Sequence, residues 1–282
     1  MFTKRWLPYW LILPAAIWLG LFFVVPFYSL VASSLFDPHG SVLTGYQVTF
    51  HFDNFVDVVQ KYWPHMWRAM WWAVVATLLC LVLGYVLAYA IAFKTGRWKN
   101  LVLIMVVAPF FTSFLIRTYA WKLILADKGW VVHALQSVHI LGADGRIIQT
   151  PVAAIAGLTY NFLPFAILPL YTSIEKLDRR LIEAAGDLYA NPMKTFWKVT
   201  FPLTLPGIVG ATLLTFIPAV GDYINAELLG STNDRVVGQD IQSLFTTTGD
   251  YASAGALSVI LMLVILVMTL AYVRKAGTEE LL

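Results

Sequence analysis

Long runs of apolar residues dominate the chain, and short polar segments separate them. Six runs are long enough to cross the hydrocarbon core of a bilayer, which takes about 20 residues of helix. The apolar positions are continuous rather than alternating, so they predict helices and exclude a membrane barrel. We therefore expect an all-α integral membrane protein with six transmembrane helices in one transmembrane domain, residues 1–282. The spans lie near residues 9–35, 66–93, 101–125, 151–174, 203–222 and 251–273.

The composition supports this expectation. Of 282 residues, 59% are hydrophobic and only 12% are charged, about half the charged fraction of a typical soluble domain. A soluble fold of this length could not bury so much apolar surface, because folded proteins keep a large area in contact with water. This excludes a soluble enzyme and a disordered chain. The net charge of +3 is too small to indicate nucleic acid, so membrane lipid is the expected surrounding.

The distribution of basic residues predicts the orientation of the spans. Twelve of the 19 Lys and Arg residues lie in the two termini and in two loops on the same side of the predicted membrane. Four lie in the opposite loops, and three lie within spans. The positive-inside rule therefore predicts that both termini are cytoplasmic. The twelve are Lys4, Arg5, Lys94, Arg97, Lys99, Lys176, Arg179, Arg180, Lys194, Lys198, Arg274 and Lys275.

Several common nucleotide-binding and catalytic motifs are missing from the sequence. There is no G-x-x-x-x-G-K-[ST] phosphate loop, so we do not expect the chain to hydrolyse ATP. Neither G-x-S-x-G nor H-E-x-x-H occurs, and the single Cys80 cannot form an internal disulfide. We expect no catalytic residue, no metal and no cofactor in this chain. No internal repeat is evident, so an inverted-repeat secondary transporter gains no support.

The loops on the outer side contain two short helical patterns. Asp53 precedes an amphipathic segment and is a good helix cap, which predicts a short helix there. A second apolar pattern at helical spacing begins after Gly129 and ends near Val138. We expect both to lie on the outer surface of the bundle.

The segment of residues 175–202 is long for a cytoplasmic connection. Asp178 is a good N-cap, and Asn191 followed by Pro192 is a second helix start. We therefore expect two short helices that meet near Tyr189. The first helix has one apolar face, and an apolar face exposed to the cytoplasm favours a partner protein. That face consists of Leu181, Ala184, Ala185 and Leu188.

The triplet Glu183-Ala184-Ala185, followed by Phe201-Pro202-Leu203, resembles the EAA loop of permease subunits of ABC importers. The resemblance implies that this loop docks into a cleft of an ATPase subunit. The family usually has glycine where Tyr189 stands, and glycine eases the turn between the two helices. Tyr189 must either take an allowed conformation or contact the ATPase. The implied ATPase-coupling residues are Leu181, Glu183, Ala184, Ala185, Gly186, Asp187, Leu188 and Tyr189.

Further strings resemble the B-type permease subunits of spermidine/putrescine importers, and the resemblance runs from Leu11 to Val273. It implies the six-helix, MetI-like fold of type I ABC importer permeases. It also implies a bacterial plasma (inner) membrane location and a second permease subunit that is a different, related chain. Two ATPase subunits would carry ATP and Mg, and an extracytoplasmic binding protein would deliver the polyamine. The strings are Leu170–Asp178, Ser113–Trp121, Ile217–Tyr223, Glu227–Gly230 and Asp250–Ala252.

Charged residues within the spans are the candidates for contact with a cationic cargo, because charges in lipid usually face the bundle interior. If the helices are straight, Arg117 and Asp222 lie about 26 Å and 28 Å along their spans. They form either a structural ion pair, or a path in which Asp222 and Glu227 receive ammonium groups and Arg117 sets their geometry. Aromatic faces also attract alkylammonium ions. The candidate path residues are Asp222, Glu227, Tyr160, Asn161, Trp121, Tyr223 and Arg117.

Other functions remain open from the sequence. The same machine could carry iron, sulfate, phosphonate or a sugar, and Arg117 keeps an anionic cargo open while Asp222 and Glu227 argue against it. A stand-alone channel or secondary transporter would leave the EAA-like loop unexplained. A membrane enzyme would need a catalytic constellation, and the sequence contains none.

Overall fold

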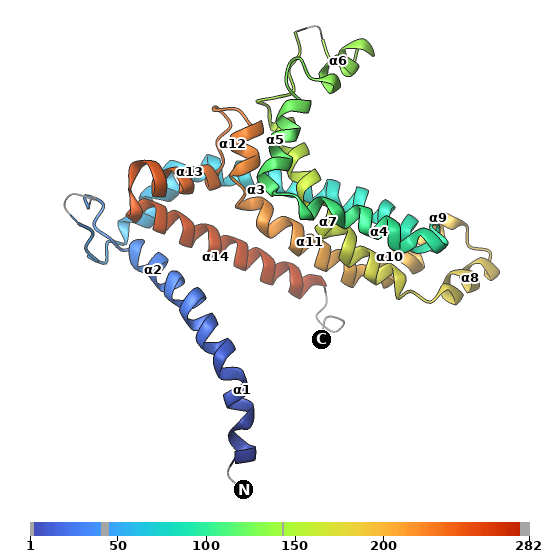
Figure 1. Cartoon of the computed structure of the whole chain (residues 1–282), viewed down its shortest axis with the longest axis horizontal. Helices are drawn as coiled ribbons and strands as arrows, with labels where there is room; N and C mark the ends of the chain where they lie inside the picture. Colours follow the sequence, from blue (N-terminus) through green and yellow to red (C-terminus); the bar gives the residue numbers. More distant parts are fainter. Residues whose placement is uncertain (1–2, 41–44, 143, 277–282) are drawn as a thin grey trace. The chain divides into compact units, whose positions relative to one another are not determined.

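The computed structural model describes residues 3–40, 45–142 and 144–276, which fold almost entirely into helices (Figure 1). An isolated antiparallel β-bridge joins Phe36 to Val48. The chain divides into two compact units. One contains residues 1–63 and 240–264, and the other contains residues 64–239 and 265–282.

The first unit begins with an apolar helical run that matches the first predicted span. Residues Leu11–Ser33 form a candidate span of 23 residues, and none of its most apolar window is buried. A π-helical segment ends two residues before Pro26, whose ring would clash with the carbonyl oxygen four residues earlier in a regular α-helix. The elements of this run are α1 (Thr3–Leu19), η1 (Gly20–Val24) and α2 (Val25–Ser33).

Helix α3 (Asp53–Phe93) is 41 residues long. The separate short helix predicted after Asp53 is wrong, because that segment is the first part of α3. The helix continues through Pro64 into the second predicted span, so the lost hydrogen bond and the steric clash of this one proline do not end it. At its start the Asn54 amide donates to the carbonyl oxygens of Ser34 (3.1 Å) and Phe36 (2.9 Å).

The remaining helices are short, apart from three. They are η2 (Gly96–Trp98), α4 (Lys99–Val107), η3 (Ala108–Phe111), α5 (Phe114–Ile124), α6 (Trp130–Ser137), α7 (Pro151–Glu175), α8 (Arg179–Asp187), α9 (Pro192–Thr195), η4 (Phe196–Thr200), α10 (Phe201–Leu203), α11 (Leu205–Val220), α12 (Ile224–Leu229), α13 (Val237–Ser243), η5 (Leu244–Thr248) and α14 (Tyr251–Ala276). Helix α6 confirms the predicted helix after Gly129.

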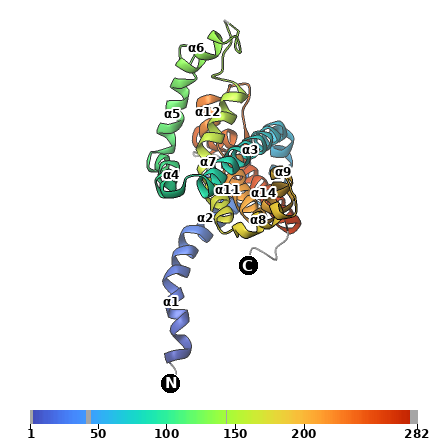
Figure 2. The same cartoon turned by 90° about the vertical axis from the view of Figure 1, so that its right-hand side faces the viewer.

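Helix α7 is the centre of the second unit and packs against α11, α12 and α5 (Figures 1 and 2). Small residues allow the close approach, as in other membrane bundles. A Cβ added to Gly157 would lie 2.3 Å from Leu229 Cδ1, and one added to Gly207 would lie 2.4 Å from Ser173 Cβ. One added to Gly84 of α3 would lie 3.3 Å from Cβ of Ala166.

The third predicted span is not one straight helix. The helices of residues Gly96–Phe111 and Phe114–Ile124 meet at 94°, and Figure 2 shows α4 and α5 forming this corner. Pro109 lies in the tightened segment η3, and Thr112 after it is extended. Proline cannot donate a backbone hydrogen bond and clashes with the preceding turn, which explains the break. The continuous helix expected over 101–125 is therefore wrong.

The fifth predicted span begins with a similar bend. Residues Pro192–Leu203 and Leu205–Val220 meet at 67°, next to Thr204. In total, four helices of the described chain are long and apolar enough to cross a membrane, or up to six if each bent pair is one span. The single domain over residues 1–282, the span boundaries and the cytoplasmic termini stay predictions.

Candidate functional site

A buried polar network joins α5, α7 and α12. Asn161 donates through Nδ2 to Thr118 Oγ1 and to Asn225 Oδ1, both at 3.1 Å. All three residues are fully buried. Side-chain hydrogen bonds between helices hold a bundle together where no water can satisfy the same groups. The predicted path residue Asn161 is therefore part of the packing of the three helices.

Asp222 is bound to the start of α12. Its carboxylate accepts the Asn225 backbone N–H at Oδ1 (2.7 Å) and the Asn225 side-chain amide at Oδ2 (3.2 Å). A carboxylate in this position caps the first turn of the helix. Asp222 thus extends the buried network through Asn225, and both of its oxygens are engaged within the chain.

No ion pair joins Arg117 to Asp222 among the described residues, so the alternative of a structural ion pair between them is wrong. The Arg117 guanidinium lies over the rings of Phe110 (5.7 Å) and Phe114 (5.6 Å). Only 9% of Arg117 is exposed, and its Nε and one terminal nitrogen have no hydrogen-bond partner in the described part of the chain. The predicted height of Arg117 assumed a straight third span, and the bend before α5 removes that assumption.

Glu227 and Tyr223 form the exposed part of the site. They are four residues apart, the spacing that places side chains on one helical face, and the Glu227 N–H donates to the Tyr223 carbonyl (2.8 Å). Tyr223 is 41% exposed, and Glu227 is also exposed. Gln239 Nε2 donates to Glu227 Oε2 at 2.6 Å. An exposed carboxylate next to an aromatic ring can receive an alkylammonium group.

The aromatic pair predicted on the third and fourth spans is also present. The Trp121 and Tyr160 rings lie 5.4 Å apart in an edge-to-face arrangement. Tyr160 is 36% exposed, whereas Trp121 packs against the buried cluster of Leu125, Ala153 and Leu229. The pair lies on α5 and α7, the helices that contact α12.

Sequence reasoning missed Thr118, Asn225 and Gln239. Thr118 and Asn225 lie next to residues that were predicted, but nothing in their spacing shows that α5 and α12 meet at Asn161. Gln239 lies twelve residues after Glu227 in another helix. A polar residue within an otherwise apolar, helical segment is the signal that could have singled out Asn225.

The second candidate surface is the segment between α7 and α11. Its two predicted helix starts are confirmed: Asp178 accepts the Arg180 N–H (3.0 Å) at the start of α8, and Asn191 accepts the Lys194 N–H (2.8 Å) at the start of α9. Only Ala185 on the predicted apolar face is buried. The other candidate coupling residues are exposed, namely Leu181, Glu183, Ala184, Gly186, Asp187, Leu188 and Tyr189.

Tyr189 occupies the turn between α8 and α9 with a left-handed backbone, φ 58°. This conformation costs a residue with a side chain about 1–2 kcal/mol and is readily taken by glycine. The side chain is 98% exposed, and the preceding Leu188 is 82% exposed. The turn therefore presents two large apolar side chains to the surroundings.

Contacts of Tyr85 and Arg179 join this segment to α3. Tyr85 of α3 shares a hydrogen bond with Thr204 (2.9 Å) and packs edge-on against Phe196. Arg179 at the start of α8 lies over the Phe93 ring and donates to the carbonyl of Ala92 (3.3 Å). These contacts fix the segment to the Phe93 end of α3, which is the end that the sequence predicts to be cytoplasmic.

The family model described as binding-protein-dependent transport system inner membrane component matches residues 80–275. The chain therefore belongs to this family of membrane-spanning transport proteins. The matched residues include the candidate coupling surface and all the candidate path residues.

Among known proteins, the chain is similar to the spermidine/putrescine transport system permease protein PotB. It is 43% identical to PotB of Haemophilus influenzae over 178 residues, which are 63% of this chain and 62% of that protein. It is 39% identical to PotB of Escherichia coli, over 63% of this chain and 65% of that protein. The alignments thus span less than two thirds of these relatives.

Among solved structures, the fold is similar to a bacterial ABC transporter involved in the import of the acidic polysaccharide alginate. The TM-score is 0.78 at 20% identity, and the match covers 99% of this chain and 98% of that one. At this identity the similarity shows the fold, which confirms the predicted importer-permease architecture, and it carries no information on cargo.

Proposed function

We propose that the chain is the membrane-spanning permease subunit of an ATP-driven importer that moves polyamines into the cytoplasm. An external binding protein delivers the cargo, and a second, related permease chain completes the membrane path. Two ATPase subunits bind ATP and Mg and hydrolyse the nucleotide. In this arrangement both termini and residues 175–202 are cytoplasmic. The similarity to the spermidine/putrescine permeases supports the choice of cargo.

The observation that carries the cargo proposal is the exposed carboxylate of Glu227 on the same helical face as the exposed ring of Tyr223. A polyamine alternates ammonium groups with short apolar stretches. A carboxylate pairs with an ammonium group. An aromatic face attracts the same kind of group by about 0.5–2 kcal/mol. The Trp121–Tyr160 pair offers a second aromatic surface on the neighbouring helices. Asp222 contributes less, because its oxygens hold α12.

The ATPase docking proposal rests on the exposed surface of α8 and of the turn after it. Leu181, Leu188 and Tyr189 are 47%, 82% and 98% exposed. Large apolar side chains gathered on a short, well-capped segment outside the spans favour a protein partner. The contacts with Phe93, Ala92 and the Tyr85 ring then transmit movement of this surface to α3.

The test is uptake of radiolabelled spermidine and putrescine into proteoliposomes that contain this chain, its ATPase, its partner permease and its binding protein. We expect uptake that requires ATP, requires the binding protein and is competed by unlabelled polyamines. A complex that hydrolyses ATP without polyamine uptake would keep the importer and overturn the cargo, and iron, sulfate, phosphonate and sugars would then be tested. Uptake without ATP would overturn the importer itself.

A further inference from the structure

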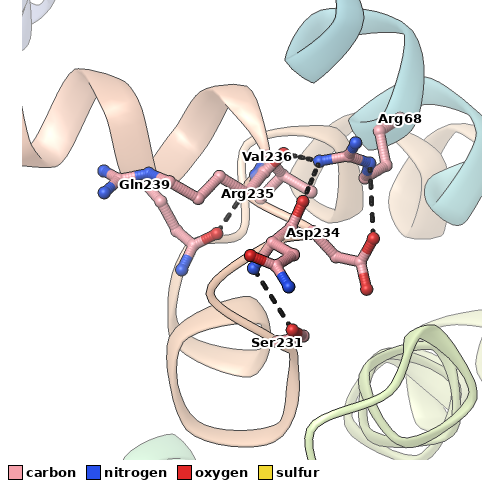
Figure 3. A network of polar contacts seen from close by, with 7 residues as sticks. Arg68, Ser231, Asp234, Arg235, Val236 and Gln239 are labelled. Atoms are coloured by element: carbon pink, nitrogen blue, oxygen red, sulfur yellow. Dashed lines mark hydrogen bonds and ion pairs between the residues drawn. The ribbon is translucent and has the colours of Figure 1, made fainter.

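Arg68 of α3 contacts the loop between α12 and α13 (Figure 3). The Arg68 guanidinium donates to the carbonyl oxygens of Arg235 (2.7 Å) and Asn233 (3.4 Å), and its Nε lies 4.0 Å from the Asp234 carboxylate. Within the loop, the Asn233 N–H donates to Ser231 Oγ at 3.2 Å. A guanidinium is a planar fork of donors, so it fixes several backbone groups at once.

The next link is the side-chain amide of Gln239. Its Oε1 accepts the Val236 N–H at the end of the loop (3.1 Å), and its Nε2 donates to Glu227 Oε2 (2.6 Å). Gln239 is 6% exposed, whereas Glu227 is exposed. Because the Val236 N–H can only donate, it must meet the amide oxygen, and the amide nitrogen is left facing Glu227. The amide therefore cannot be turned over without losing both bonds.

We propose that Arg68 and Gln239 are positioning residues for the Glu227 carboxylate. This inference rests on the proposed function, in which Glu227 receives an ammonium group of the cargo. Arg68 fixes the loop, the loop places the Val236 N–H, Val236 orients the Gln239 amide, and Gln239 holds one oxygen of Glu227. The second oxygen then points in a defined direction before the cargo arrives.

Such support matters because a surface glutamate has many rotamers. Ordering a flexible side chain when the cargo binds costs about 0.5–1.5 kcal/mol, and a carboxylate ordered in advance avoids this cost. The hydrogen bond from Gln239 is charge-assisted, which makes it stronger than a bond between neutral groups. The start of α13, which carries Gln239, also lies close to the residue before Asp222, since a Cβ added to Gly238 would be 2.7 Å from the Gly221 carbonyl oxygen.

The experiment is a double-mutant cycle on ATP-dependent spermidine uptake by the complete complex in proteoliposomes. The variants are Arg68→Ala, Gln239→Glu, Glu227→Gln and each of the first two combined with Glu227→Gln. Gln239→Glu keeps an acceptor for the Val236 N–H but replaces the donor by a second carboxylate beside Glu227. Uptake is measured against the concentration of spermidine-loaded binding protein and normalised to the amount of assembled complex.

We expect Arg68→Ala and Gln239→Glu each to lower uptake efficiency about tenfold, the effect of losing one hydrogen bond to a charged group. In the Glu227→Gln background the same changes are expected to cost less than about twofold, because the group that they position is gone. The matched control is Arg146→Ala. It removes a different arginine–aspartate pair, with Asp127 at 3.4 Å, that lies outside the predicted spans, and should leave uptake unchanged.

Equal losses with and without the Glu227→Gln change would show that Arg68 only stabilises the fold, and would overturn the inference. Unchanged uptake in Gln239→Glu would overturn it as well, and this variant decides the matter if Arg68→Ala does not assemble. Absence of spermidine uptake by the unmodified complex would overturn the proposed function together with this inference. Normal uptake by the unmodified complex with additive losses in the cycle would overturn the inference alone.

Discussion

Tyr189→Gly tests two properties of the turn between α8 and α9: the backbone strain at Tyr189, and the proposed contact of its side chain with the ATPase. The left-handed backbone at φ 58° costs tyrosine about 1–2 kcal/mol relative to glycine. Glycine itself lowers stability by about 0.5–1 kcal/mol, because it loses more conformational freedom on folding than other residues do. The side chain is 98% exposed, so its removal loses no packing within this chain. The backbone N–H keeps its bond to the Gly186 carbonyl (2.9 Å).

The chain with Tyr189→Gly is therefore expected to be more stable by roughly 0.75 kcal/mol, the difference between the midpoints of these two costs. Its affinity for the ATPase is expected to fall, because a buried tyrosine at the centre of an interface contributes about 2 kcal/mol, or about thirtyfold. Stability is measured by denaturant unfolding of the detergent-solubilised permease pair. Affinity is measured by titrating the purified ATPase onto that pair immobilised in detergent.

The matched control is Gln149→Gly, which relieves a similar left-handed backbone, φ 61°, in an exposed residue outside residues 175–202. It should raise stability by a similar amount and leave ATPase affinity unchanged. Tyr189→Gly with unchanged ATPase affinity would refute the reasoning, since the strained tyrosine would then have no partner to explain it.

Three further changes test other parts of the structure. Glu183→Lys, on the exposed surface of α8, should abolish stimulation of the ATPase while cargo-loaded binding protein still binds the complex; normal transport would contradict docking at this surface. Asp222→Ala should lower unfolding stability by about 1 kcal/mol, since it removes the oxygens that accept the Asn225 N–H and side-chain amide at the start of α12, and uptake per assembled complex should stay near normal; a large loss of uptake would instead place Asp222 in the cation path. Gly157→Ala should destabilise the chain by about 1–3 kcal/mol through overpacking, because its Cβ would lie 2.3 Å from Leu229 Cδ1. The control in thermal unfolding is Gly142→Ala, because a Cβ added at Gly142 would meet no neighbouring atom of the described chain within 4 Å.

The features that the sequence predicted correctly depend on local chemistry. Asp178 and Asn191 were identified as caps because a cap binds the backbone within three residues of itself, and both bonds are present. The helix after Gly129 follows from the spacing of its apolar residues. The turn at Tyr189 follows from the few residues that separate the helix after Asp178 from the helix after Asn191. None of these features requires knowledge of which helices are neighbours.

The features that it could not predict depend on tertiary contacts. Hydropathy treats residues 101–125 as one apolar run, and the 94° bend is visible only in how the chain turns around Pro109. Charge alone paired Arg117 with a carboxylate, but the folded chain surrounds it with the rings of Phe110 and Phe114. The partner of Asp222 is Asn225, three residues away, and not Arg117, to which charge alone would assign it.

Helix α3 explains how the two candidate surfaces can influence each other. Arg68 holds the loop that supports Glu227, and the same helix meets residues 175–202 through Tyr85, Ala92 and Phe93. From Arg68 to Phe93 the helix rises about 38 Å at 1.5 Å per residue, and Pro64 lies before this stretch rather than inside it. Because the backbone hydrogen bonds are continuous over this length, we expect a displacement of the Phe93 end to carry Arg68 with it. The helix that contacts the proposed ATPase surface therefore also sets the position of the carboxylate proposed to meet the cargo.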